Sequence, residues 1–146
     1  MRDSNWARAS LRVFSNALTP EELAEVLAIQ PDKSYRIGDR ISRRPSSMAV
    51  RETNALFVES GLPNDRDLDE HLTALLDRIE GASENLRSLA GRAKMDVFCG
   101  FSSGNGLGGF LLSPSLLTRL ATLGLDVDFD LYLPPAELAP DVIRDE

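Results

Sequence analysis

The sequence contains a single cysteine, Cys99, and a single histidine, His71, among its 146 residues. One cysteine excludes an internal disulfide, so a reducing compartment is the simpler expectation. One histidine excludes a metal site built from several histidines. No apolar run approaches the roughly 18 residues of a membrane span, and the first residues lack the apolar region of a secretion signal. The sequence therefore predicts a cytoplasmic protein.

Positive charge is also scarce, because 16 Lys and Arg residues face 23 Asp and Glu residues, a formal net charge of −7. Nucleic acid and anionic membranes would be repelled at long range, so we expect neither as a partner. A basic or neutral protein, or a second copy of the chain, is a more natural partner. Length and hydrophobic content fit one domain, which we place at residues 1–133, followed by an acidic, flexible tail at 134–146.

Residues 111–132 carry the clearest structural pattern. Ser113 suits a helix cap, Pro114 the first helical position, and Gly124 the helix end. The period then changes to two, which is typical of a strand with one apolar and one acidic face. The apolar face holds Leu125, Val127, Phe129 and Leu131, and the other face holds Asp126, Asp128, Asp130 and Tyr132.

A similar unit occurs near the N-terminus. A period-two strand over residues 7–14 precedes a helix that starts at Thr19, with Glu22 completing a capping box and Pro31 marking the end. The two units predict an α+β fold made of ferredoxin-like duplicated βαβ units, a mostly antiparallel sheet with helices packed on one face. Alternatively, the two helices share only common start signals.

The middle of the chain adds further elements. Residues 54–60 and 94–101 read as strands, and Asp67 with Glu70 predicts a second capped helix over 67–79. A shorter helix starts near Ser83. Whether residues 33–60 supply one strand or two stays open.

Residues 33–51 form the one cationic stretch of an acidic chain. This loop could hold an anion or an acidic partner segment; alternatively, it is a surface loop that pairs with the protein's own carboxylates. The candidate anion or partner residues are Arg36, Arg40, Arg43 and Arg44.

Residues 104–109 satisfy the pattern G-x-G-x-x-G, but the helix starts only after Ser113, too late to receive a pyrophosphate. Asn105 and Gly106 instead favour a hairpin turn. His71 is expected to be a partly exposed helix residue. Cys99 falls on the apolar side of its strand, where a thiol is usually inert. No catalytic residue, metal site or cofactor is therefore expected.

The acidic strand face could bind a divalent cation, but residues two apart lie about 7 Å from each other, too far to chelate one ion well. In a ferredoxin-like sheet the last strand lies beside the first, so Arg8 and Arg12 should pair with these aspartates. Three aromatic residues, Phe14, Phe98 and Tyr132, fall on the polar side of their strands. Either the middle segment covers them or they form a docking face for a protein.

Several segments resemble the bacterial family named domain of unknown function 4279. They are A-S-L-R-V-F-S at 9–15, L-T-P-E-E-L at 18–23 with I-Q-P at 29–31, Y-R-I-G-D at 35–39, and L-G-L-D-V-D-F-D-L-Y at 123–132. Such sequences usually carry a tryptophan in the strand where this chain has Leu56 and Phe57, whereas its only tryptophan is Trp6. The resemblance implies a bacterial cytosolic α+β protein and carries over no catalytic residue.

The function expected from these features is that of a small binding protein, an inhibitor or immunity-type protein that acts on a protein partner. The alternative is an anion-sensing protein or an enzyme that uses the arginine-rich loop at residues 33–51.

Overall fold

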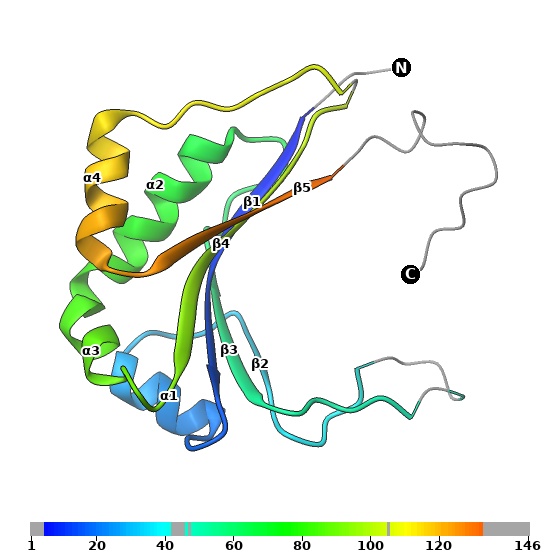
Figure 1. Ribbon diagram of the computed structural model, residues 1–146, viewed down its shortest axis with the longest axis vertical. Coiled ribbons are helices and arrows are strands. Elements are labelled where there is room, and N and C mark those ends of the chain that lie inside the picture. The colour runs from blue at the N-terminus through cyan, green and yellow to red at the C-terminus, as the bar shows by residue number, and fades with distance from the viewer. Residues whose placement is uncertain (1–4, 42–45, 47, 105, 133–146) are drawn as a thin grey trace.

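The computed structural model describes residues 5–41, 46, 48–104 and 106–132 and consists of one sheet with helices packed against one of its sides (Figure 1). The elements in chain order are β1 (Trp6–Ser15), α1 (Pro20–Leu27), β2 (Lys33–Tyr35), β3 (Asn54–Glu59), α2 (Leu68–Ile79), a 3₁₀ turn (Glu80–Ala82), α3 (Ser83–Ser88), β4 (Lys94–Ser102), α4 (Pro114–Leu123) and β5 (Asp126–Tyr132).

The sheet has five strands in the order β2-β3-β1-β4-β5. Strand β1 lies at the centre and pairs antiparallel with β3 and with β4. Strand β2 pairs antiparallel with β3, and β5 pairs parallel with β4. The mixed α+β class and the mostly antiparallel sheet expected from the sequence are therefore confirmed.

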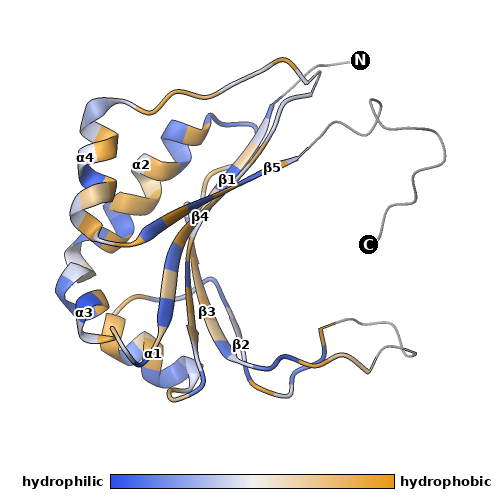
Figure 2. Cartoon of the chain, viewed as in Figure 1, coloured by the Kyte–Doolittle hydropathy of each residue, from blue (hydrophilic) through white to orange (hydrophobic). Residues whose placement is uncertain are grey.

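The core lies between the sheet and the helices, and strand parity decides which residues enter it. On β1 the odd-numbered positions from Ala7 to Val13 are at most 2% exposed, and on β4 the same holds for Val97 and Cys99. The helices contribute leucines at helical spacing, and Figure 2 shows apolar residues on their sheet-facing sides. The helical part of the core includes Leu23, Leu27, Leu68, Leu72, Leu75, Leu76, Ile79, Leu116 and Leu120.

The helix starts agree with the cap signals. The Thr19 hydroxyl accepts from the Glu22 amide at 3.1 Å, and the Glu22 carboxylate accepts from the Thr19 amide at 2.9 Å. Ser113 caps α4 in the same way, through the Leu116 amide. Helix α1 ends at Leu27, earlier than Pro31 suggested, because Ala28 adopts a left-handed conformation with φ 56°.

The predicted ferredoxin-like duplication is not confirmed. Strands β1 and β2 flank β3, whereas β4 and β5 are direct neighbours, so the two strand–helix–strand units are placed differently in the sheet. The expectation that the last strand lies beside the first is wrong, because β5 pairs with β4. Alternating charge identifies a half-exposed strand but does not say which strand is its neighbour.

Two further expectations are decided by the strand assignments. Residues 33–60 supply two strands, β2 and β3. The hairpin turn expected near Gly106 is wrong, because the chain runs from β4 into α4 and returns parallel to β4. The tail at 134–146 lies outside the described residues.

Candidate functional site: the open face of the sheet

The side of the sheet that faces away from the helices carries polar and aromatic side chains, and no described helix covers it (Figure 1). We call this side the open face. Because cross-strand partners share a face, the register places each residue on it. The main open-face residues are Trp6, Arg8, Ser10, Arg12 and Phe14 of β1, Lys33 and Tyr35 of β2, Phe57 and Glu59 of β3, Asp96, Phe98 and Gly100 of β4, and Asp126, Asp128, Asp130 and Tyr132 of β5.

Arginines and aromatic rings alternate across this face. The Arg12 guanidinium lies 4.5 Å from the Phe98 ring centroid and 5.6 Å from that of Phe14. The Arg8 guanidinium lies 5.6 Å from Phe98 and 5.3 Å from Trp6. Trp6 in turn meets Tyr132 edge to face at 5.5 Å. We call this series, Phe14–Arg12–Phe98–Arg8–Trp6–Tyr132, the arginine–aromatic ladder.

The ladder connects the three aromatic residues that the sequence placed on the polar side of their strands. Phe14, Phe98 and Tyr132 lie on the same side of the sheet but do not touch one another directly. The two arginines and Trp6 fill the spaces between them. The sequence leaves open whether the middle segment covers these rings; of that segment, Phe57 packs edge to face on Phe14 at 6.0 Å.

Arg12 is held by carboxylates from two strands. Its Nε and Nη2 donate to Asp96 at 2.8 and 2.6 Å, and Nη2 lies 3.4 Å from Asp128. These hydrogen bonds raise the pKa of Arg12, chiefly through Asp96. The expected pairing of Arg12 with the acidic strand is therefore present, although it spans β4, and Asp96 is the stronger partner. Because Nε and Nη2 of Arg12 are both hydrogen-bonded to Asp96, the guanidinium has a defined position on the ring of Phe98.

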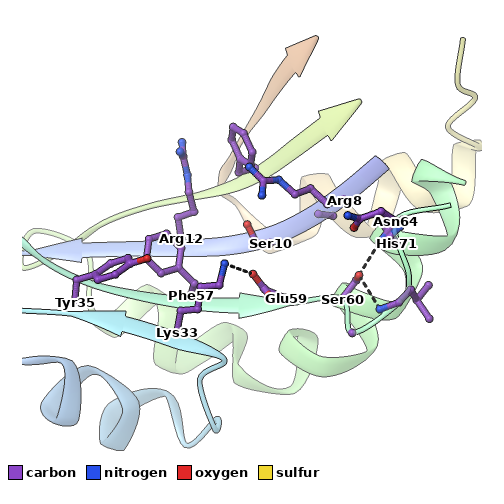
Figure 3. Close-up of a pocket in the computed structure, with 14 residues that line it drawn as sticks. Arg8, Ser10, Arg12, Lys33, Tyr35, Phe57, Glu59, Ser60, Asn64 and His71 are labelled. Carbon is purple, nitrogen blue, oxygen red and sulfur yellow. Dashed lines mark hydrogen bonds and ion pairs between the residues drawn. The ribbon is translucent and has the colours of Figure 1, made fainter. Parts of the chain in front are cut away.

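A hollow of about 540 Å³ opens on the β1–β3–β2 side of the ladder (Figure 3). Its polar wall contains Arg8, Arg12 and Lys33, and the Lys33 ammonium lies 3.4 Å from the Glu59 carboxylate. The remaining wall is aromatic, with Tyr35 edge to face on Phe57 at 5.6 Å. The loop after β3 closes one end, and the lining there includes Ser60, Gly61, Leu62, Asn64 and His71.

His71 is fully buried, which corrects the expectation that it is partly exposed. It shares the core-facing stripe of α2 with Leu68 and Leu72, because residues three and four apart lie on one side of a helix. Its Nδ1 lies 2.6 Å from the Ser60 hydroxyl, while Nε2 is buried without a hydrogen bond of good geometry. Burial lowers the pKa of His71, and the nearby Pro63 carbonyl opposes that shift.

Of the cationic stretch at residues 33–51, Lys33 and Tyr35 line the hollow, whereas the candidate residues Arg36 and Arg40 do not. Arg36 forms an ion pair with Glu21. Arg40 pairs with Val50 in an isolated antiparallel β-bridge between the segments that follow β2 and precede β3. Arg43 and Arg44 lie outside the described residues. Arg51 instead stacks on Tyr35 at 3.9 Å from the ring centroid, so it borders the aromatic wall.

The other candidate residues have structural explanations. The Gly108 amide donates to the Ser103 hydroxyl at 2.7 Å, and a Cβ at Gly108 would lie only 2.9 Å from that oxygen, so close packing requires this glycine. Cys99 is fully buried, and burial raises the pKa of its thiol to about 12. Among the described residues no group of three or more His, Cys, Asp or Glu side chains is arranged to hold a metal ion.

A family model for the domain of unknown function 4279 matches residues 4–134. The chain is a DUF4279 protein. The match covers all described strands and helices, including every residue of the ladder and of the hollow. Searches of the curated proteins and of the solved structures found no match to this DUF4279 protein. No helix in the described part of the chain has the length and apolar content needed to cross a membrane.

Sequence reasoning missed several residues that this DUF4279 protein brings together. Trp6 lies just outside the strand expected over residues 7–14, yet it continues the even-numbered phase of Arg8 and Arg12, which was a usable signal. Lys33 and Glu59 meet only because β2 lies beside β3. That contact depends on strand order, which no local pattern specifies.

Proposed function

We propose that this DUF4279 protein is a binding protein, and that a partner protein docks on the β4–β5 half of the open face. The observation that carries the proposal is the arginine–aromatic ladder, which lies on a sheet face that no described helix covers. Tryptophan, tyrosine and arginine are the residues that most often dominate binding energy at protein interfaces. Their rings and guanidinium groups already contact one another, so little side-chain freedom remains to be lost on binding.

The charge of this half favours a basic partner. Asp126, Asp128 and Asp130 project from β5 on the open face, and Arg12 is the cation paired with this row. The chain as a whole carries a net charge of −7. Complementary charge speeds the encounter with a basic protein and disfavours acidic competitors.

Inhibition is the activity that such a surface best supports. Proteins that act on polyanions need an exposed basic surface, and an acidic protein that covers this surface blocks them. An inhibitor or immunity-type role is therefore our proposal. A cytoplasmic site of action is part of it, since the single buried cysteine has no need of an oxidising compartment.

The test uses the purified 146-residue chain as bait in lysate of the native host. The docking variant combines Asp130→Lys with Tyr132→Ala, two exposed positions on β5. The matched control combines Glu25→Lys on α1 with Leu117→Ala on α4, which makes the same change of charge and removes a similar exposed apolar group from the helix side. Both variants should melt close to the wild type.

We expect the wild type and the control to retain one basic protein in a stoichiometric amount. The docking variant should retain at least about tenfold less, because loss of one anchor side chain at the centre of an interface costs 2 kcal/mol or more, on the order of a 30-fold change. Equal capture by the docking variant and the control would refute the docking surface. A wild-type bait that captures no specific protein would refute partner binding itself.

The strand order supports a second proposal, which concerns the architecture of the fold. We infer that β1 to β4 form a ferredoxin-like βαββαβ unit, to which α4 and β5 are added at the β4 edge. The support is the order β2-β3-β1-β4, in which each of the two strand–helix–strand crossovers skips one strand.

A further inference from the structure

We propose that the hollow on the β1–β3–β2 side of the open face binds an organic carboxylate that carries a planar apolar group. The carboxylate would lie against Arg8 and Ser10, and the planar group against Phe57. This site adjoins the docking half formed by β4 and β5 and shares Arg8, Arg12 and Phe98 with the ladder, but its ligand goes beyond the partner proposed above.

Charge at the hollow is opposite to that of the protein. Three cationic side chains line it against a single carboxylate, that of Glu59. Arg12 is hydrogen-bonded to Asp96, and Lys33 forms an ion pair with Glu59 at 3.4 Å. Arg8, in contrast, has no carboxylate partner among the described residues and rests on two aromatic rings. Arg8 also lies within hydrogen-bond reach of the Tyr132 hydroxyl, and because that hydroxyl is neutral, the guanidinium can still bind a carboxylate with charge-assisted hydrogen bonds.

The floor of the hollow supplies a second donor. Ser10 is only 9% exposed, lines the hollow, and its hydroxyl has no hydrogen-bond partner among the described residues. Its oxygen is open to the hollow rather than sealed from solvent, so it can donate a hydrogen bond to a bound oxygen there. Ser10 and Arg8 stand two residues apart on the same face of β1, about 7 Å between Cα atoms. The long Arg8 side chain can span this distance, so the two oxygens of one bound carboxylate can meet both side chains.

The other walls define the rest of the ligand. Tyr35 and Phe57 meet edge to face, and Phe98 closes the opposite side beneath Arg8 and Arg12. These rings can contact a planar apolar group. A volume of about 540 Å³ falls within the range of about 300–1,000 Å³ typical of small-molecule sites. The Glu59 carboxylate would repel a second negative charge, which favours a monoanion over a phosphate dianion.

The test measures binding of benzoate to the purified chain by protein-observed NMR titration, with the neutral isostere benzamide as ligand control. We expect benzoate to bind in the millimolar range and to shift the amide signals of β1 and β3 around Ser10 and Glu59. Arg8→Gln should weaken binding about 10- to 100-fold, the range for a charge-assisted hydrogen bond, and Ser10→Ala about 3- to 10-fold. Arg87→Gln, an exposed substitution on α3, removes the same charge from the helix side and should change nothing.

Two results would overturn the inference: benzamide binding as tightly as benzoate, or Arg8→Gln binding benzoate as tightly as the wild type. Absence of any benzoate-induced shift would overturn it as well. Titration with a second acid, N-acetylphenylalanine, distinguishes the two kinds of molecule that could supply such a carboxylate, a peptide C-terminus and a free aromatic acid. Tighter binding of this acid points to the C-terminal carboxylate of a peptide, and tighter binding of benzoate points to a free aromatic acid. Neither titration requires the partner protein, so the outcome is independent of the capture experiment.

Discussion

The buried His71 should make this protein lose stability in mild acid, well before its carboxylates are protonated. The folded protein keeps the imidazole neutral, because burial lowers the pKa of His71 below the ordinary value of 6.5. In the unfolded chain the imidazole takes up a proton near pH 6.5. The unfolded state then binds more protons than the folded state, so the free energy of unfolding falls as the pH drops below 6.5 and is fully retained above it.

The size of the effect follows from one proton. While the unfolded chain is protonated and the folded chain is not, the loss is about 1.4 kcal/mol per pH unit. Between pH 6.5 and about pH 5 the limit is therefore about 2 kcal/mol. The sequence contains no other histidine, and the carboxylates with lowered pKa values, such as Asp32, Glu70 and Glu80, titrate at lower pH.

The matched variant is His71→Phe, which keeps a ring in the core and removes the titrating group. At pH 7.5 it should be less stable than the wild type by about 1–2 kcal/mol, because the Ser60 hydroxyl loses its 2.6 Å partner. Near pH 5 the difference should shrink or reverse. Urea denaturation of both untagged proteins at several pH values measures this directly. A wild type with constant stability from pH 7.5 to 5, or a variant with the same slope as the wild type, would refute the reasoning.

Two further experiments, one substitution and one chemical modification, test the packing of the two sheet faces. Gly100→Ala would place a Cβ 3.1 Å from the ring of Trp6, the only tryptophan, so we expect the ring to move. The fluorescence emission should shift to the red, and the free energy of unfolding should fall by about 1 kcal/mol. In the control Gly81→Ala the new Cβ meets no atom within 4 Å, so the emission should not change, and equal spectra for the two variants would contradict the close contact. On the core face, Cys99 should react with a thiol reagent only at the rate at which the protein opens, because burial raises its pKa to about 12; fast modification of the native protein would show that the thiol is accessible.

Local patterns in the sequence predicted the elements of this fold well. The alternation on β1 separates the core residues Ala7 and Leu11 from the open-face residues Arg8 and Arg12, and it depends only on strand geometry. The helix starts were equally accessible, because the capping signals act within one turn.

Strand order could not be obtained in the same way. The acidic face of β5 is compatible with either β1 or β4 as neighbour, since Arg12 is long enough to reach Asp128 across β4. The hollow depends on that order, because Lys33 and Glu59 join Arg8 only when β3 lies beside β1 and β2 lies beside β3. His71 was misjudged for a related reason. Its burial is tolerated because the loop after β3 supplies Ser60 as a partner, and that loop is distant from the helix pattern.

Arg12 separates the two regions of opposite charge on the open face. It lies between the hollow and the acidic row, and it neutralises Asp96, whose side chain is only 19% exposed, and part of the charge of Asp128. Without this arginine the partly buried carboxylate of Asp96 would extend the negative potential toward the hollow, which would oppose an anion there. With it, a cationic hollow and an acidic row coexist on adjacent strands. The same guanidinium also fixes the ring of Phe98, so one side chain keeps the two charge regions apart and holds the aromatic surface that joins them.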